Sequence, residues 1–336
     1  MNFRGGIAVW TVVLPLVGST CPAVGGDDPS PDAEPTTASS PDVVAATVNG
    51  EPITLGSVND AVQSVLQGRP VNPTALKQLQ AEVLAQLIDR ALIMQMLEKT
   101  GRTTSSQVVN QALEQVKKQA EEKQVNFAKM LADRKLTEEQ FREQLAWQIN
   151  WSKYLQSVLT DEALKAYFEA HRREFDGSEL RVSHILLQAD SVGSPAENER
   201  LKKMAEKLRE QIIAGKIQFE EAARRYSAGP SRHKGGDLGF IPRHGLMLEP
   251  FAAATFKLSK QQLSEPVISP YGVHLIKVTA DNPGQKVWSD VKEQLKGPAG
   301  QQVFEQLAAK ERKSGRVTFT GKCPHFKPGT RELAEP

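Results

Sequence analysis

Few residues in this sequence have the types and spacing that chemistry requires. The two cysteines are Cys21 and Cys323, and His325 follows the second by two positions. Two cysteines cannot build a disulfide framework, and one Cys–His pair falls short of the four ligands of a structural zinc site. We therefore expect no metal and no other cofactor, and we interpret Cys323 as a free thiol.

Two histidines lie in segments that have the composition of buried strands. His184 interrupts the run 181–187, which alternates and then becomes apolar, and His274 lies within 267–278. Runs of this kind favour central strands. A single histidine in a strand is most often a core residue with a satisfied hydrogen bond, so its position alone assigns it no reaction.

The segments around these histidines predict a mixed domain. A charged helix is expected over 196–214, where Gly215 ends it, and a second short helix over 219–226. Glycine-rich turns, another helix and further strands follow as far as Val278. Strands and helices in this order describe an α+β domain.

Five short motifs of this domain resemble those of the parvulin-type peptidylprolyl cis–trans isomerases. In chain order they are Ser183–Leu186, Tyr226–Ser227, Gly235–Gly239, Pro250–Phe251 and Gly272–Ile276. The resemblance covers about 179–278. It implies a small antiparallel sheet with flanking helices, and the isomerisation of X-Pro peptide bonds.

The resemblance also implies roles for six residues. An X-Pro bond isomerises slowly because twisting it costs the amide resonance, so a catalyst needs a socket for the proline ring and groups that favour the twisted amide. The residues that match the socket are Leu238, Met247 and Phe251, and those that match the paired histidines and their supporting hydroxyl are His184, His274 and Ser269. The alternative for the first three is ordinary core packing.

One position departs from the family pattern. Relatives carry Cys or Asp two residues after the Tyr-Ser pair, where this chain has Gly229. If that side chain helps to stabilise the twisted amide, turnover here is reduced, although the fold and proline binding survive. A second absence concerns substrate: the stretch 188–194 has no Arg or Lys to pair with a phosphate, so we predict no phosphate requirement.

The residues before this domain predict a helical arm. A strand over 43–48, a tight Asn49–Gly50 turn and a return strand over 52–54 come first, and helical spacing extends to about Phe175. Apolar residues at steps of three and four form one stripe: Leu76, Leu79, Val83, Leu84, Leu87, Ile88 and Leu92. Thr137 and Gln140 have capping-box spacing. Trp147 and Trp151 share a helical face, as core or as an exposed patch.

The residues after the mixed domain add to that arm. One or two helices over 287–313, broken near Gly297–Pro298, and a strand over 317–319 are expected. The opening segment, the arm and the export signal described next resemble the exported foldases of the PrsA and SurA kind. In that family the C-terminal helix packs on the arm, which implies an all-helical chaperone domain beside the parvulin-like one.

The first 42 residues predict export. A charged start, an apolar core over 7–17 and small residues before Cys21 are typical of a secretory signal, and the apolar core is too short to span a bilayer. The next stretch is rich in Pro, Ser, Thr and Gly, which favours a disordered tether. Cys21 is a candidate for lipidation, with export without an anchor as the alternative. A buried N-terminal strand or helix is the alternative to the signal.

Composition excludes other classes. Lys and Arg number 42 against 40 Asp and Glu, so no large basic surface for nucleic acid is expected.

The predicted division is signal peptide 1–20, tether 21–42, helical chaperone domain 43–177, parvulin-type domain 178–280, and C-terminal helix and tail 281–336. We expect an exported foldase that acts on unfolded or partly folded proteins with X-Pro bonds. The alternatives are a non-catalytic chaperone and a tethered receptor with one partner.

Overall fold

The computed structural model describes residues 43–134, 136–188, 195–330 and 332–334. Within these ranges the chain forms two compact units, one made of residues 161–296 and the other of residues up to 160 together with 297–336. The expected signal peptide, the tether, Cys21 and most of the loop 188–194 lie outside the described residues. In the described ranges, no helix has the length and apolarity that crossing a bilayer requires.

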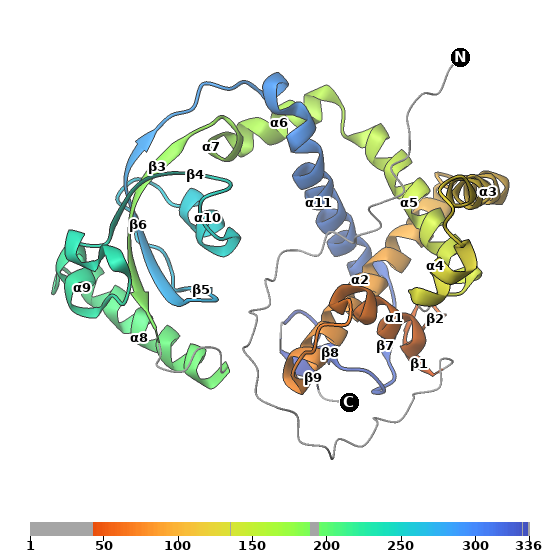
Figure 1. Cartoon of the computed structure of the whole chain (residues 1–336), viewed down its shortest axis with the longest axis horizontal. Coiled ribbons are helices and arrows are strands. Elements are labelled where there is room, and N and C mark those ends of the chain that lie inside the picture. Colours follow the sequence, from red (N-terminus) through yellow and green to blue (C-terminus); the bar gives the residue numbers. More distant parts are fainter. Residues whose placement is uncertain (1–42, 135, 189–194, 331, 335–336) are drawn as a thin grey trace. The chain divides into compact units, whose positions relative to one another are not determined.

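The unit that contains both chain ends of the described part is mainly helical (Figure 1). Its elements are β1 (Val44–Val48), β2 (Glu51–Thr54), α1 (Leu55–Leu66), α2 (Pro73–Lys99), α3 (Ser106–Glu122), α4 (Phe127–Asp133), α5 (Glu138–Val158), the C-terminal part of α11 (Trp288–Ser314), β7 (Val317–Phe319), β8 (His325–Phe326) and β9 (Leu333–Ala334). We call it the helical unit.

A three-stranded sheet joins the start of the helical unit to its end. β1 pairs antiparallel with both β2 and β7. The expected turn is present, since Asn49 and Gly50 have φ of 52° and 96°, values that Asn and Gly tolerate best. The backbone N–H of Asn49 donates to the carbonyl of Arg316 at 2.8 Å, and the N–H of Arg316 donates to Asn49 Oδ1 at 2.8 Å. Residues far apart in sequence are thereby fixed together.

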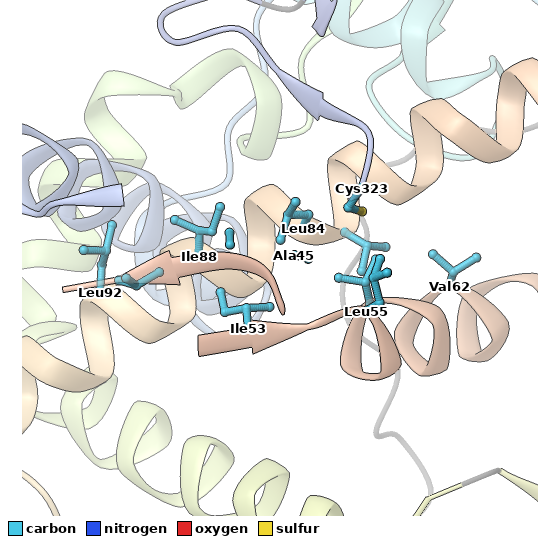
Figure 2. Close-up of a cluster of buried hydrophobic side chains, with 12 residues drawn as sticks. Ala45, Ile53, Leu55, Val62, Leu84, Ile88, Leu92 and Cys323 are labelled. Carbon is cyan, nitrogen blue, oxygen red and sulfur yellow. The ribbon is translucent and has the colours of Figure 1, made fainter. Parts of the chain in front are cut away.

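The core of the helical unit lies between this sheet, α1 and α2 (Figure 2). The predicted stripe supplies it: Val83, Leu84, Ile88 and Leu92 are buried, whereas Leu76, Leu79 and Leu87 are partly buried at its margin. Cys323 completes the cluster from the C-terminal segment. The capping box at the start of α5 is also present, with Thr137 and Gln140 bonding each other's backbone.

The C-terminal helix packs on the arm, as the family resemblance implied. Phe304, Leu307 and Ala308 of α11 meet α2 and α5 in a second cluster, which includes Trp147 and Trp151. The indole rings of these two residues stack with centroids 5.5 Å apart, and Phe304 meets both of them edge-on. The two tryptophans are therefore packing residues of this cluster, although each keeps some exposure.

The expected break near Gly297–Pro298 is wrong, because α11 is one continuous helix with Pro298 inside it. A proline in a helix leaves the carbonyl four residues earlier without its N–H donor. Here that carbonyl belongs to Gln294, and both Gln294 and Pro298 are exposed, so water can take the place of the missing donor.

The other unit holds the mixed domain, and we call it the parvulin unit after the family that its motifs resemble. Its elements are α6 (Asp161–Ala170), α7 (Arg172–Phe175), β3 (Glu179–Leu187), α8 (Pro195–Ile213), α9 (Phe219–Tyr226), the 3₁₀ helix η1 (Pro230–Lys234), β4 (Asp237–Pro242), α10 (Glu249–Phe256), β5 (Val267–Ser269), β6 (Gly272–Asn282) and the start of α11. The strand order is β4-β3-β6-β5 and every pair is antiparallel. The α+β class is confirmed.

Helices cover both faces of this sheet (Figure 1). Ile185 and Leu187 of β3, with Val273 and Leu275 of β6, form a core with α8 and α9. The alternate residues Leu180, Val182, Ile276 and Val278 form a second core with α10. Because side chains alternate along a strand, His184 and His274 lie on the α10 face.

Candidate active site

The two histidines form a pair at the centre of the sheet. They belong to the adjacent strands β3 and β6, where Leu186 is the register partner of His274. The Nδ1 atoms of His184 and His274 are 3.3 Å apart, and the ring centroids are 5.5 Å apart. Both residues are buried. The family resemblance implied a histidine pair, and the structure shows that the two Nδ1 atoms face each other across adjacent strands.

Ser269 extends this pair toward the edge of the sheet. Its hydroxyl oxygen lies 2.7 Å from Nε2 of His274, and the backbone N–H of Tyr271 donates to the same oxygen at 3.1 Å. Ser269 ends β5, one turn before β6 begins, so the hairpin sets this geometry. We call Ser269, His274 and His184 the histidine network.

A glycine of the Gly235–Gly239 motif holds His184 in place. The backbone N–H of His184 donates to the carbonyl of Gly236 at 2.9 Å. Gly236 has φ of 86°, and a Cβ there would lie 2.3 Å from the carbonyl oxygen of His184. Only glycine permits this approach. The motif therefore has a direct structural link to the histidine network.

The three expected socket residues belong to one apolar cluster. Phe251 is buried, and its ring meets the rings of His184 and His274 edge-on, with centroids 5.8 Å and 5.3 Å away. Leu238 and Met247 are partly buried and pack against the core cluster that contains Phe251. Phe251 thus lies directly against the imidazoles, and the two partly exposed side chains are available to a ligand.

Burial keeps the histidine network uncharged at neutral pH. It lowers the pKa of His274 from its ordinary value of 6.5 to about 4, and the nearby imidazole of His184 adds to the effect. Burial also lowers the pKa of His184. Both rings are consequently neutral at pH 7, which suits a site that binds a neutral peptide bond.

Gly229 lies against the far nitrogen of His184. A Cβ at this position would be 3.0 Å from His184 Nε2. In the described part of the chain, His184 Nε2 is one of two buried side-chain atoms without a hydrogen-bond partner, and Ser231 Oγ in η1 is the other. The departure from the family pattern therefore falls on the one nitrogen of the pair that has no partner.

Ser227 belongs to the Tyr226–Ser227 motif, but the sequence indicated no role for it in the site. Its hydroxyl oxygen accepts from the backbone N–H of Leu186 at 3.1 Å and from that of Gly229 at 3.2 Å. It thereby fastens the segment that carries Gly229 to β3. The Tyr226–Ser227 motif was the available signal, but the bond to Leu186 joins residues 41 positions apart, beyond the reach of a local pattern.

Cys323 and His325 do not converge. The thiol is free and buried, and burial raises its pKa to about 11. His325 stacks on Phe319, with ring centroids 4.1 Å apart, and its Nδ1 contacts the backbone oxygen of Cys323. The two side chains have separate structural roles.

Each of the two units matches a known protein family. Residues 184–280 match the family described as PPIC-type PPIase domain, and residues 5–155 match the SurA-like N-terminal domain. The foldase protein PrsA of Caldanaerobacter subterraneus subsp. tengcongensis is 31% identical over 250 residues, which cover 70% of this chain and 72% of that protein. The chain belongs to the parvulin-type foldases with a SurA-like N-terminal domain.

Two other relatives also match this chain over most of its length. A probable parvulin-type peptidyl-prolyl cis-trans isomerase of Bordetella bronchiseptica is 29% identical over 278 residues, which cover 81% of this chain and 91% of that protein. The chaperone SurA of Hahella chejuensis is 27% identical over 247 residues, which cover 70% of this chain and 56% of that protein. The resemblance therefore extends over both units.

Proposed function

We propose that this foldase catalyses the cis–trans isomerisation of X-Pro bonds in unfolded client proteins. The observation that carries the proposal is the neutral histidine pair against Phe251, in a domain that matches the PPIC-type isomerases. The proline ring would contact Leu238, Met247 and Phe251. His184, His274 and Ser269 would supply the polar side of the site.

The chemistry needs no bond-breaking group. The barrier to rotation, roughly 18–20 kcal/mol, is the loss of amide resonance, so a catalyst acts by binding the twisted amide more tightly than the planar one. An apolar socket holds the ring while the rest of the peptide turns. The uncharged imidazoles beneath the socket would hold its polar side in place, through bonds to each other and to Ser269, without the desolvation cost of a buried charge.

The helical unit would hold clients while the parvulin unit acts on them. Its match to the SurA-like N-terminal domain supports this division of labour, as do the relatives named foldase and chaperone. The partners would be unfolded or partly folded exported proteins. Nucleic acid is not among them, given a net charge of +2.

We also propose export to the periplasm or the cell envelope, with Cys21 as the lipidated residue of an anchored form. The relatives and the sequence of residues 1–42 support export. The division at residues 20, 42, 177 and 280 and the absence of a phosphate requirement are part of the same proposal. Mass spectrometry of the mature N-terminus, and parallel assays with phosphorylated and plain peptides, test these points.

Gly229 supports a second candidate, a non-catalytic chaperone whose parvulin unit only binds peptides. The position that carries Cys or Asp in relatives has no side chain here. In that case the unit would bind proline-containing peptides without speeding their isomerisation.

A proline-isomer assay separates the two candidates. Catalytic amounts of the full chain are added to an unphosphorylated X-Pro peptide, and the approach to cis–trans equilibrium is followed. The proposal expects acceleration by the natural chain and its loss in the His184→Ala, His274→Ala double variant, with circular dichroism as the folding control. Rates equal to those in buffer, together with measurable peptide binding, would establish the second candidate.

A further inference from the structure

The histidine network has two possible arrangements of its protons. A neutral imidazole carries one N–H and one bare nitrogen, and a hydroxyl donates one hydrogen and accepts at two lone pairs. Because Ser269, His274 and His184 are bonded in series, the position of one hydrogen fixes all the others. The series therefore points either inward, toward His184, or outward, toward Ser269.

In the inward arrangement the hydroxyl of Ser269 donates to Nε2 of His274, and Nδ1–H of His274 donates to Nδ1 of His184. This leaves an N–H at His184 Nε2. In the outward arrangement His184 donates from Nδ1 to His274, and His274 donates from Nε2 to Ser269. This leaves a bare lone pair at His184 Nε2 and frees the hydroxyl hydrogen of Ser269.

The inner end of the network decides between the two. Nε2 of His184 is closed off from water and has no partner among the described residues. It faces the Cα of Gly229, where one C–H bond points along the direction a Cβ would take, toward the nitrogen. A buried N–H without an acceptor is rarer and costlier than a bare acceptor, and a C–H group is a weak partner for a lone pair. The inner end favours the outward arrangement.

The outer end can accommodate that arrangement. Ser269 is partly exposed, unlike the two histidines. Its oxygen takes the N–H of Tyr271 and the N–H of His274 on its two lone pairs. Its own hydrogen is then free for an acceptor outside the fold. Every N–H and O–H of the network has a partner or access to one.

We propose that Gly229 sets the histidine network in the outward direction, so that the hydroxyl of Ser269 donates a hydrogen bond to a peptide carbonyl of the bound client. The absence of an acceptor at position 229 thus turns Ser269 from a support of the histidines into a group that contacts substrate. An acid at position 229 would accept from His184 Nε2–H and reverse the series. The role of Ser269 toward a client rests on the proposed function, whereas the proton arrangement does not.

The proton arrangement is measured by NMR of the full chain labelled with ¹⁵N-histidine. The ring nitrogens distinguish the two tautomers, and the spectra of His184→Gln and His274→Gln assign them among the six histidines. We expect His184 protonated at Nδ1 and His274 at Nε2. His184 protonated at Nε2 in the natural chain would overturn the proposal.

Two substitutions test the part played by Gly229. Gly229→Asp adds an acceptor and is expected to move the proton of His184 to Nε2 and that of His274 to Nδ1. Gly229→Ala adds a Cβ at the same place without an acceptor and is expected to leave both tautomers as they are. Identical tautomers in the two variants would contradict the role assigned to the glycine.

The contact with substrate is tested by peptide binding, which can be measured even if the protein does not catalyse isomerisation. Ser269→Ala is expected to weaken the binding of an X-Pro peptide about fivefold, the effect of one hydrogen bond, and Ser269→Thr to restore it. Unchanged affinity in Ser269→Ala would rule out the contact. If the natural chain shows no catalysis but the Ser269 variants change the affinity as expected, the proposed enzyme activity is refuted and the contact of Ser269 with the peptide is not.

Discussion

Each unit contains a buried polar side chain, Gln95 in the helical unit and His184 in the parvulin unit, and the two differ in how fully their hydrogen bonds are satisfied. Gln95 of α2 uses its whole amide: it accepts from Asn49 at 2.6 Å and donates to the carbonyl of Val48 at 3.1 Å and to Glu51 at 2.9 Å. His184 of β3 bonds through Nδ1 only, and its Nε2 has no partner.

The difference is the one expected between a structural polar residue and a residue with the function proposed for His184. Buried polar groups are nearly always satisfied, because leaving one without a partner costs roughly 1–3 kcal/mol. Gln95 follows this rule and fastens the Asn49–Gly50 turn to α2. His184 departs from it at the position where the sequence also departs from its relatives. A cost of this kind is expected at sites that function has shaped.

The largest effect is expected where the backbone touches His184. Gly236→Ala would place a Cβ 2.3 Å from the carbonyl oxygen of His184, at a positive φ. We expect the parvulin unit to lose about 4 kcal/mol or more and its cooperative folding with it. Gly239→Ala is the matched control, since Gly239 has φ of 75° but no neighbouring atom within 4 Å. It should cost about 1 kcal/mol. Equal losses by chemical denaturation would refute the close contact.

The next effect concerns acid. The pKa of His274 is about 4 in the folded chain, against 6.5 ordinarily. Above pH 6.5 the His274 imidazole is neutral in both the folded and the unfolded state. As the pH falls from 6.5 to 4, the unfolded state takes a proton that the folded state refuses, so stability falls by roughly 3 kcal/mol and then levels off. Denaturation of the natural chain and of His274→Gln across this range measures the difference. Parallel curves would contradict the lowered pKa.

A smaller loss of stability is expected when Gln95, the polar residue with satisfied hydrogen bonds, is replaced. Gln95→Leu removes the partners of Val48, Glu51 and Asn49, and it should destabilise the helical unit by about 2 kcal/mol without changing the isomerisation rate of a short peptide. Gln78→Leu, an exposed position on the same helix, should change stability by less than about 0.5 kcal/mol. A fall in isomerisation rate on Gln95→Leu would show that the two polar sites are not separate in function.

The smallest free-energy change is expected in catalysis, when the unpartnered His184 Nε2 is given an acceptor. Gly229→Asp gives His184 Nε2 an acceptor and installs one of the two side chains, Cys or Asp, of the family pattern. We expect kcat to rise about tenfold, or about 1.4 kcal/mol, while KM also rises because Ser269 no longer donates to the client. The kcat of Gly229→Ala should stay at the natural level. A kcat that is unchanged in both variants would mean that the missing acid does not limit turnover.

Local sequence features predicted most of the elements. Asn49–Gly50 specified its hairpin because few other pairs accept that turn, and Thr137 with Gln140 specified the start of α5 because a capping box is complete within four residues. The strand 317–319 was also found from its own composition. The expectation at Pro298 was wrong because the effect of a proline on a helix depends on whether water reaches the carbonyl four residues earlier, here Gln294, which is a property of the folded surface.

The family resemblance implied a histidine pair with a supporting hydroxyl, and the structure brings His184, His274 and Ser269 together. Their catalytic roles stay predictions. Motifs contained the two histidines, the family resemblance matched Ser269, and Gly229 stood out as a departure from the family pattern. The bonds of Gln95 to Val48 and Glu51, and that between Ser227 and Leu186, join residues more than 40 positions apart, and no local pattern contains them. Among the described residues, His184 Nε2 has no partner because Gly229 packs against it. No local sequence pattern predicts that contact.

The most direct test of the central claim is the rate of cis–trans exchange in a short unphosphorylated X-Pro peptide, measured by NMR exchange spectroscopy with catalytic amounts of the full chain. We expect acceleration over buffer, and we expect Phe251→Ala, which removes the side chain against both imidazoles, to abolish it while the helical unit still suppresses client aggregation. Exchange at the buffer rate with the natural chain, under conditions where the peptide binds, would contradict the assignment of this chain as an isomerase.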